Sequence, residues 1–94
     1  MRSLRPEQIV LLKELAIRHG FTHLGVFGSF ARGDDDESSD IDLIVSGVGH
    51  RGLSIGAFQM DAQQALNRKV DVVTRAGLHP SIRARILSEM VELS

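Results

Sequence analysis

Asp40-Ile41-Asp42-Leu43-Ile44-Val45 is the stretch of sequence that decides the fold and locates the candidate site. Its first residues alternate between acidic and apolar. Because successive side chains of a strand point to opposite faces, this alternation predicts a strand with Asp40 and Asp42 on the same face. Two carboxylates that close together repel each other and raise each other's pKa unless a cation lies between them. The pair therefore either costs stability or holds a metal ion.

A second apolar run, Leu24-Gly25-Val26-Phe27, lies before this stretch and stops at Gly28-Ser29. This arrangement is typical of a strand that leads into a turn of small residues, whose backbone N–H groups and hydroxyl can approach phosphate oxygens closely. Such a turn ahead of the two acids favours the metal interpretation over simple repulsion. We therefore expect a site for a triphosphate and a metal ion here.

Apolar periodicity and terminal residues predict the remaining elements. They indicate a helix from about Pro6 to His19, a strand from Thr22 to Phe27, a strand from about Asp40 to Val45, a helix ending near Asn67, a strand from Val70 to Thr74 and a final helix opened by Pro80. A strand, a helix and a strand in succession suggest a right-handed parallel pair, which would put Asp71 beside Asp42. The strand that ends at Gly28 must run the other way, because only a short turn follows it. The predicted fold is α+β, a small mixed sheet of about three strands with helices packed on it.

Composition narrows the function. A chain of 94 residues, 43% apolar and 24% charged, is expected to form a single domain over residues 1–94, without room for a separate substrate domain. Its aromatic residues are 4 Phe and its formal net charge is -1, which argue against direct binding of nucleic acid. Because the chain has no Cys, a metal would need oxygen or imidazole ligands. There is no apolar signal core and no apolar run of about 20 residues, so we expect a cytoplasmic protein that does not contact a membrane.

The Gly28-Ser29 turn, the Asp40-Ile41-Asp42 motif and Asp71, within Lys69-Val70-Asp71-Val72-Val73-Thr74, resemble the minimal nucleotidyltransferases of the DNA polymerase beta superfamily. The pattern of that family is an apolar strand, Gly-Ser, a short loop, Asp-x-Asp and a third, more distant carboxylate on another strand. The resemblance runs over nearly the whole chain. It implies a nucleotidyltransferase fold like the palm of polymerase beta.

The resemblance also implies roles for these residues. Asp40, Asp42 and Asp71 would be catalytic and would bind Mg²⁺, with two ions expected. Asp40 and Asp42 would bridge the metals, while Asp71 would hold the catalytic ion and help to deprotonate the acceptor hydroxyl. Gly28 and Ser29 would hold the β- and γ-phosphates of ATP, which leave as pyrophosphate.

Some residues keep two interpretations. Arg32 either contacts phosphate or ties the glycine turn to an acid such as Asp40. Arg68 and Lys69 either help with nucleotide charge or form a solvated pair before a strand, and we favour the second. Phe30 stands where the family often has a basic residue, which questions any phosphate contact from that side chain. The acidic run 34–37 is expected to be a solvated turn, because adjacent side chains diverge rather than converge on one ion.

At the level of function, the resemblance implies the antitoxin of a two-gene toxin–antitoxin pair. It would transfer AMP from ATP to a hydroxyl, expected to be that of a Tyr, on a helical HEPN-type toxin with which it forms a hetero-oligomer. Two alternatives stay open: a non-catalytic antitoxin that neutralises the toxin by binding, and a small-molecule nucleotidyltransferase with a separate substrate-binding subunit. The intact acidic triad argues against the first, and the lack of a pocket-forming domain argues mildly against the second.

Overall fold

The structure is a computed structural model that describes residues 4–34, 39–47 and 53–93. Its elements, in chain order, are α1 (Pro6–Arg18), β1 (His23–Phe27), α2 (Ser29–Arg32), β2 (Ile41–Ser46), α3 (Leu53–Leu66), β3 (Val70–Thr74), α4 (Pro80–Glu89) and β4 (Val91–Glu92). The predicted helices and strands are all present, with ends shifted by a residue or two. The expectation for the acidic run 34–37 lies outside the described residues, apart from Asp34.

The sheet has the order β3-β2-β1-β4. β2 and β3 are parallel, whereas β1 is antiparallel to both β2 and β4, so the predicted mixed sheet is confirmed. The expected number of strands was too low by one. β4 is only two residues long, too short for a periodic pattern, and it exists because Val91 and Glu92 pair with Val26 and Gly25 of β1.

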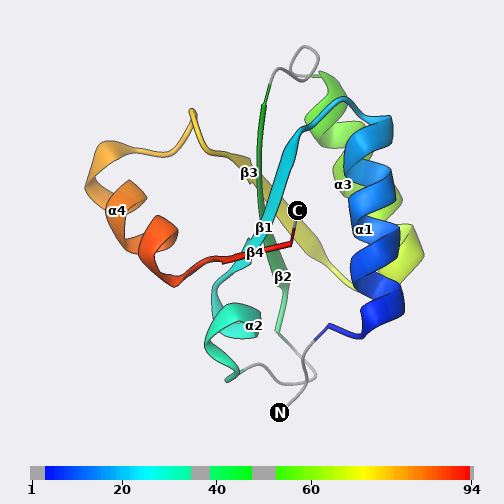
Figure 1. The fold of residues 1–94 in the computed structure, drawn as a ribbon, viewed down its shortest axis with the longest axis horizontal. Helices are drawn as coiled ribbons and strands as arrows, with labels where there is room; N and C mark the ends of the chain where they lie inside the picture. Colours follow the sequence, from blue (N-terminus) through cyan, green and yellow to red (C-terminus); the bar gives the residue numbers. More distant parts are fainter. Residues whose placement is uncertain (1–3, 35–38, 48–52, 94) are drawn as a thin grey trace.

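Helices cover the two faces of the sheet unequally. Figure 1 shows α1 and α3 together on one side of the strands and α4 on the other. On β2, Ile41, Leu43 and Val45 belong to the larger buried cluster, which includes residues of α1 and α3. Ile44 points the opposite way and packs with Leu78 and with Ile86 of α4. The alternation predicted for this strand is therefore confirmed, and Asp42 shares the α4 face with Ile44.

The apolar face of α1 that is buried against the sheet is narrow. Leu12, Leu15 and Ala16 are buried against the sheet, but Val10 is 54% exposed and Ile17 is 70% exposed. None of the helices in the described part of the chain is long and apolar enough to cross a membrane.

Two short features complete the frame around the candidate site. α2 has four residues and follows β1 directly, where the sequence indicated only a turn. Asn67 ends α3 with a φ of 51°, as its position near a helix exit predicted. This exit turns the chain back into β3, beside β2.

Candidate active site

Asp42 and Asp71 lie side by side at the centre of the candidate site. Asp42 is the second residue of β2, and the parallel register pairs it with Asp71 of β3. On its other side, Asp42 pairs with Phe27, the last residue of β1. Burial raises the pKa of the Asp42 carboxyl above its ordinary value, and the charges of Asp71 and Asp40 raise it further. The predicted parallel pairing of β2 with β3 therefore brings the like charges of Asp42 and Asp71 together.

Asp40 is placed differently from the other two acids. It precedes β2 rather than lying in it, and its Oδ2 atom is 3.7 Å from Nζ of Lys69. Within residues 4–34, 39–47 and 53–93, no group of three or more acidic or histidine side chains converges closely enough to hold a metal ion. The structure thus joins Asp42 with Asp71, while the carboxylate of Asp40 faces a lysine.

Gly28 forms the turn between β1 and α2 and lies directly against Asp42. Its φ of 74° is one that side-chain-bearing residues rarely adopt. A Cβ added here would collide with the carboxylate of Asp42. Glycine at this position therefore lets the chain turn close to the acids. The first N–H groups of any helix lack intrahelical partners, so the first turn of α2, from Ser29, directs donors to this region.

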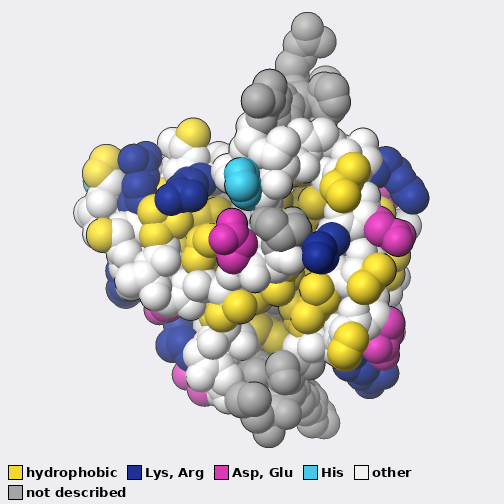
Figure 2. Space-filling view, viewed as in Figure 1, with side chains coloured by type: hydrophobic (Ala, Val, Ile, Leu, Met, Phe, Trp, Pro, Cys, Tyr) yellow, Lys and Arg dark blue, Asp and Glu magenta, His cyan; other side chains and the backbone are white. Residues whose placement is uncertain are grey.

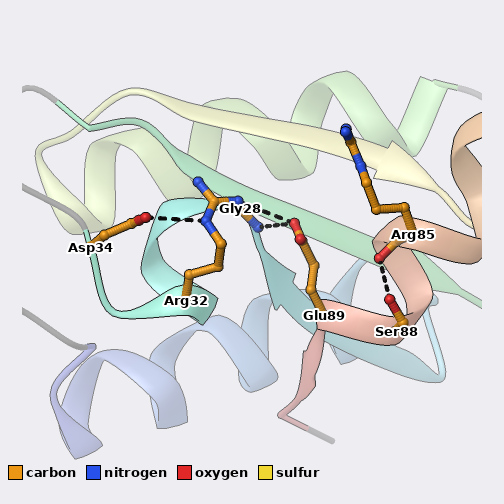
Figure 3. Close-up of polar contacts among 6 residues, drawn as sticks. All are labelled: Gly28, Arg32, Asp34, Arg85, Ser88 and Glu89. Atoms are coloured by element: carbon orange, nitrogen blue, oxygen red, sulfur yellow. Dashed lines mark hydrogen bonds and ion pairs between the residues drawn. The ribbon is translucent and has the colours of Figure 1, made fainter.

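Glu89, at the end of α4, fastens this turn (Figure 3). Its Oε1 atom accepts hydrogen bonds from the backbone N–H of Gly28 and from Nη1 of Arg32, both at 3.3 Å. Nε of Arg32 donates to Oδ2 of Asp34 at 3.2 Å. Of the two interpretations of Arg32, the structure therefore shows the tie to acids, which are Asp34 and Glu89 rather than Asp40. The Arg32 side chain remains 49% exposed, so part of it stays accessible to a ligand.

Sequence reasoning overlooked Glu89 because 61 positions separate it from Gly28. A single acid at the end of a mostly exposed helix gives no local signal of such a contact.

The hydrogen bond to Asp34 and the charge of that residue raise the pKa of the Arg32 guanidinium, with a smaller contribution from Glu89. The Arg32 guanidinium is thus held between two carboxylates.

Arg68 supports the site from the other side. Its Nε donates to the backbone carbonyl of Ser39 at 2.9 Å, and its guanidinium carbon lies 5.0 Å from the centre of the Phe30 ring. These contacts link the start of β2 to α2 through a cation–π interaction. Arg68 is therefore a positioning residue rather than the solvated cation that the sequence suggested, while Lys69 pairs with Asp40 and is largely exposed.

The donor set of this site suits Mg²⁺. Asp42 and Asp71 offer only oxygen atoms, which Mg²⁺ prefers, and their mutual repulsion is the condition that a divalent cation relieves. Mg²⁺ completes its coordination with waters or phosphate oxygens, so two protein carboxylates are enough to begin such a site. The residues present therefore fit this metal.

Comparison with known proteins gives a consistent result. The sequence profile of the nucleotidyltransferase domain family matches residues 10–93. A candidate protein adenylyltransferase of Methanocaldococcus jannaschii, MJ0435, is 35% identical over 80 residues, which cover 84% of this chain and 86% of that protein. The protein adenylyltransferase MntA of Thermococcus cleftensis is 34% identical over 80 residues, covering 84% of this chain and 81% of that protein.

Solved structures share the fold. The structure of a candidate minimal nucleotidyltransferase superposes with a TM-score of 0.81 at 34% identity, covering 90% of this chain and 88% of that one. A toxin–antitoxin structure with AMP-PNP superposes with a TM-score of 0.79 at 19% identity, covering 97% of this chain and 73% of that one. A chain from the complex of a tri-AMPylated Shewanella oneidensis HEPN toxin with an MNT antitoxin superposes with a TM-score of 0.75 at 15% identity. The match covers 97% of this chain and 72% of that one. The last two likenesses bear on the fold alone.

Proposed function

The chain belongs to the nucleotidyltransferase domain family, and from this premise we propose that it transfers AMP from ATP to a hydroxyl group, expected to be that of a Tyr, on a helical HEPN-type toxin. It would act as the antitoxin of that toxin. The two relatives described as protein adenylyltransferases support the reaction. The fold that the chain shares with proteins from toxin–antitoxin complexes supports the partner.

The observation that carries the proposal is the meeting of three segments around Asp42. The register puts Asp71 on one side of it, and Gly28 approaches its carboxylate as only a glycine can. Carboxylates on adjacent strands and a glycine turn at the start of a helix therefore face one small volume. This is what phosphoryl transfer requires, because a triphosphate must lie against both donors and metal-binding acids.

The reaction forms a bond between the acceptor hydroxyl oxygen and the α-phosphorus of ATP. The bond from that phosphorus to the oxygen bridging to the β-phosphate breaks, and pyrophosphate leaves with its electron pair. Asp71 accepts the hydroxyl proton. The first-turn N–H groups of α2 and the Ser29 hydroxyl donate to the β- and γ-phosphates, while Arg32 adds positive charge beside the turn. Glu89 keeps the turn in place by accepting a hydrogen bond from the backbone N–H of Gly28.

Asp40, Asp42 and Asp71 would hold Mg²⁺, which, when bound, neutralises charge on the phosphates. The raised pKa of Asp42 favours a cation at this position, since a cation offsets the repulsion from Asp71 and Asp40. Asp40 would have to release Lys69 to take part. The pair is separated by 3.7 Å and the lysine is 68% exposed, so it is weak.

The proposal is tested by intact-mass spectrometry of the product of the neighbouring gene, which we expect to be the helical partner. Purified chain and partner are incubated with ATP and MgCl₂, and the partner should gain the mass of one or more AMP groups. Asp42→Asn, which keeps the side-chain shape, is the matched control and should leave the mass unchanged. If the wild-type chain suppresses the partner without changing its mass, neutralisation by binding replaces the enzymatic proposal. A gain of AMP on a small molecule alone would instead point to a small-molecule transferase.

A further inference from the structure

A concave feature lies at the opposite end of β2 and β3 from Asp42 and Asp71. This open depression, of about 520 Å³, is lined by Ser46, Arg75, Ala76, Arg83 and Leu87. Ser46 ends β2, Arg75 follows β3, and the last two lining residues belong to α4. We call it the arginine cavity, and the proposed transfer reaction gives it no role.

The arginine cavity opens on the same face of the sheet as the candidate active site. Ser46 follows Asp42 and Ile44 at intervals of two along β2, so the three side chains leave the same face. Leu87 packs with the cluster around Ile44, which lies under α4. Four residues of strand separate Asp42 from Ser46, which corresponds to about 13 Å. A protein docked across α4 can therefore reach both places at once.

No acidic side chain among the described residues forms an ion pair with either arginine of the cavity, Arg75 or Arg83. Nη2 of Arg83 donates to the carbonyl of Leu78 at 3.2 Å, but Nε is shielded from solvent without a hydrogen-bond partner. Arg83 is half-buried and keeps its charge, so an anion that meets the accessible part of this guanidinium would be stabilising. The surface around α4 combines this positive charge with apolar side chains (Figure 2), including Ile82, which is 40% exposed.

We propose that the arginine cavity binds a carboxylate side chain of the acceptor protein and so docks that protein with its hydroxyl at Asp71. This rests on the proposed function, since it names the docking site of the same acceptor. Arg is suited to carboxylates through its planar fork of donors, and Leu87 and Ile82 suit the apolar neighbours of an acidic side chain in a polypeptide. A nucleic acid is disfavoured because the chain has a net charge of -1 and no Trp or Tyr for base stacking.

The separation sets a requirement on the acceptor. A helix rises 1.5 Å per residue, so about 13 Å corresponds to about nine residues of a helical acceptor. In an extended segment the same span takes about four residues. The acceptor should therefore carry an acidic side chain at one of these distances from the hydroxyl that receives AMP.

The first test needs neither ATP nor the natural acceptor. The probe is a short fluorescent peptide in which Glu alternates with Leu, and binding is followed by fluorescence anisotropy at low salt. Arg75→Glu should weaken binding by about tenfold or more, equivalent to about 1.4 kcal/mol. Arg18→Glu is the matched control, because Arg18 is an exposed arginine of α1 on the other side of the sheet. A peptide with Gln in place of Glu should bind at least about tenfold more weakly than the acidic one.

Equal affinity of Arg75→Glu and Arg18→Glu for the acidic peptide would overturn the proposal, as would a wild-type chain that does not bind this peptide. So would complete displacement of the peptide by inorganic phosphate at similar concentration, which would mark a free-anion site, or tighter binding of single-stranded RNA that Arg75→Glu abolishes. Because Arg75 is exposed, its replacement is not expected to unfold the chain, and thermal melting checks this. Arg83→Gln provides a second variant with the charge removed.

The second test uses the acceptor itself. Arg75→Glu should raise KM for the acceptor by about tenfold, again about 1.4 kcal/mol, while KM for ATP and the turnover at saturating acceptor stay close to wild type. A general structural defect would instead change all three quantities. If no AMP is transferred by the wild-type chain but the peptide still binds through Arg75, the proposed function fails and the docking site stands.

Discussion

Gly28 lies so close to Asp42 that a single added methyl group would collide with the carboxylate. Gly28→Ala should therefore lower the free energy of unfolding by about 1–3 kcal/mol, because it adds that collision to the strain of a positive φ. Gly56→Ala is the control. Gly56 lies in α3 with open space where an added Cβ would lie, so alanine there should stabilise by about 0.5–1 kcal/mol. Urea denaturation measures both, and equal effects of the same sign would contradict the contact.

Asp42→Asn should leave thermal stability at neutral pH unchanged or slightly higher, and it should abolish AMP transfer. Burial and the charges of Asp71 and Asp40 raise the pKa of Asp42 above the ordinary 3.8, so the folded chain binds this proton more tightly than the unfolded chain. The ionised carboxylate thus costs stability above the raised pKa, and the cost vanishes below 3.8, where both states are protonated. The advantage of the variant should accordingly shrink as pH falls. A loss of several degrees at neutral pH would mark Asp42 as a structural residue instead.

Glu89→Ala should destabilise the fold by about 1–2 kcal/mol, because the N–H of Gly28 and the guanidinium of Arg32 both lose their acceptor. Solvent screens the ion pair with Arg32, whose side chain is half-exposed, and this limits the loss of stability. Glu92→Ala is the matched control on β4: its carboxylate is 60% exposed and lies 3.6 Å from His23, so the loss should stay below about 0.5 kcal/mol. Comparable losses for the two variants, measured by urea denaturation, would remove the special role of Glu89.

ATP should bind only in the presence of a divalent cation. Without one, the triphosphate would meet the carboxylates of Asp42 and Asp71 in a partly buried site, where like charges repel strongly. Isothermal titration calorimetry with MgCl₂ and with EDTA measures the difference. Equal affinity in the two conditions would contradict a metal role for the acids.

Asp71→Asn separates binding from chemistry. ATP affinity should stay within about tenfold of wild type, or about 1.4 kcal/mol, because Asp40 and Asp42 remain for the nucleotide-bound Mg²⁺. Transfer should fall much further, since a carboxylate that acts on the attacking hydroxyl contributes in the transition state rather than in the bound ground state. Calorimetry gives the first quantity and intact-mass spectrometry of the acceptor the second. Parallel losses in both would show that Asp71 mainly holds the nucleotide.

Local pattern was sufficient for the central strands. Alternation along 40–45 placed Ile41 in one core and Ile44 in the other, and the strand–helix–strand order predicted the parallel pair that brings Asp71 to Asp42. Both inferences depend on rules that act within a short segment or on the handedness of a single crossover. The nucleotidyltransferase motif was recognisable from sequence for the same reason. Its residues lie at or next to the ends of β1, β2 and β3, which local pattern predicts.

Contacts between distant segments were decided only by the tertiary structure. β4 forms because β1 offers an open edge, and the acceptor of the Gly28 N–H comes from Glu89, near the other end of the chain. The contact of Arg68 with Phe30 and the arginine cavity likewise need several elements to be in place. Single charged side chains on exposed helix turns follow no period, so their partners depend on how α4 and α2 pack against the sheet rather than on the residues beside them in sequence.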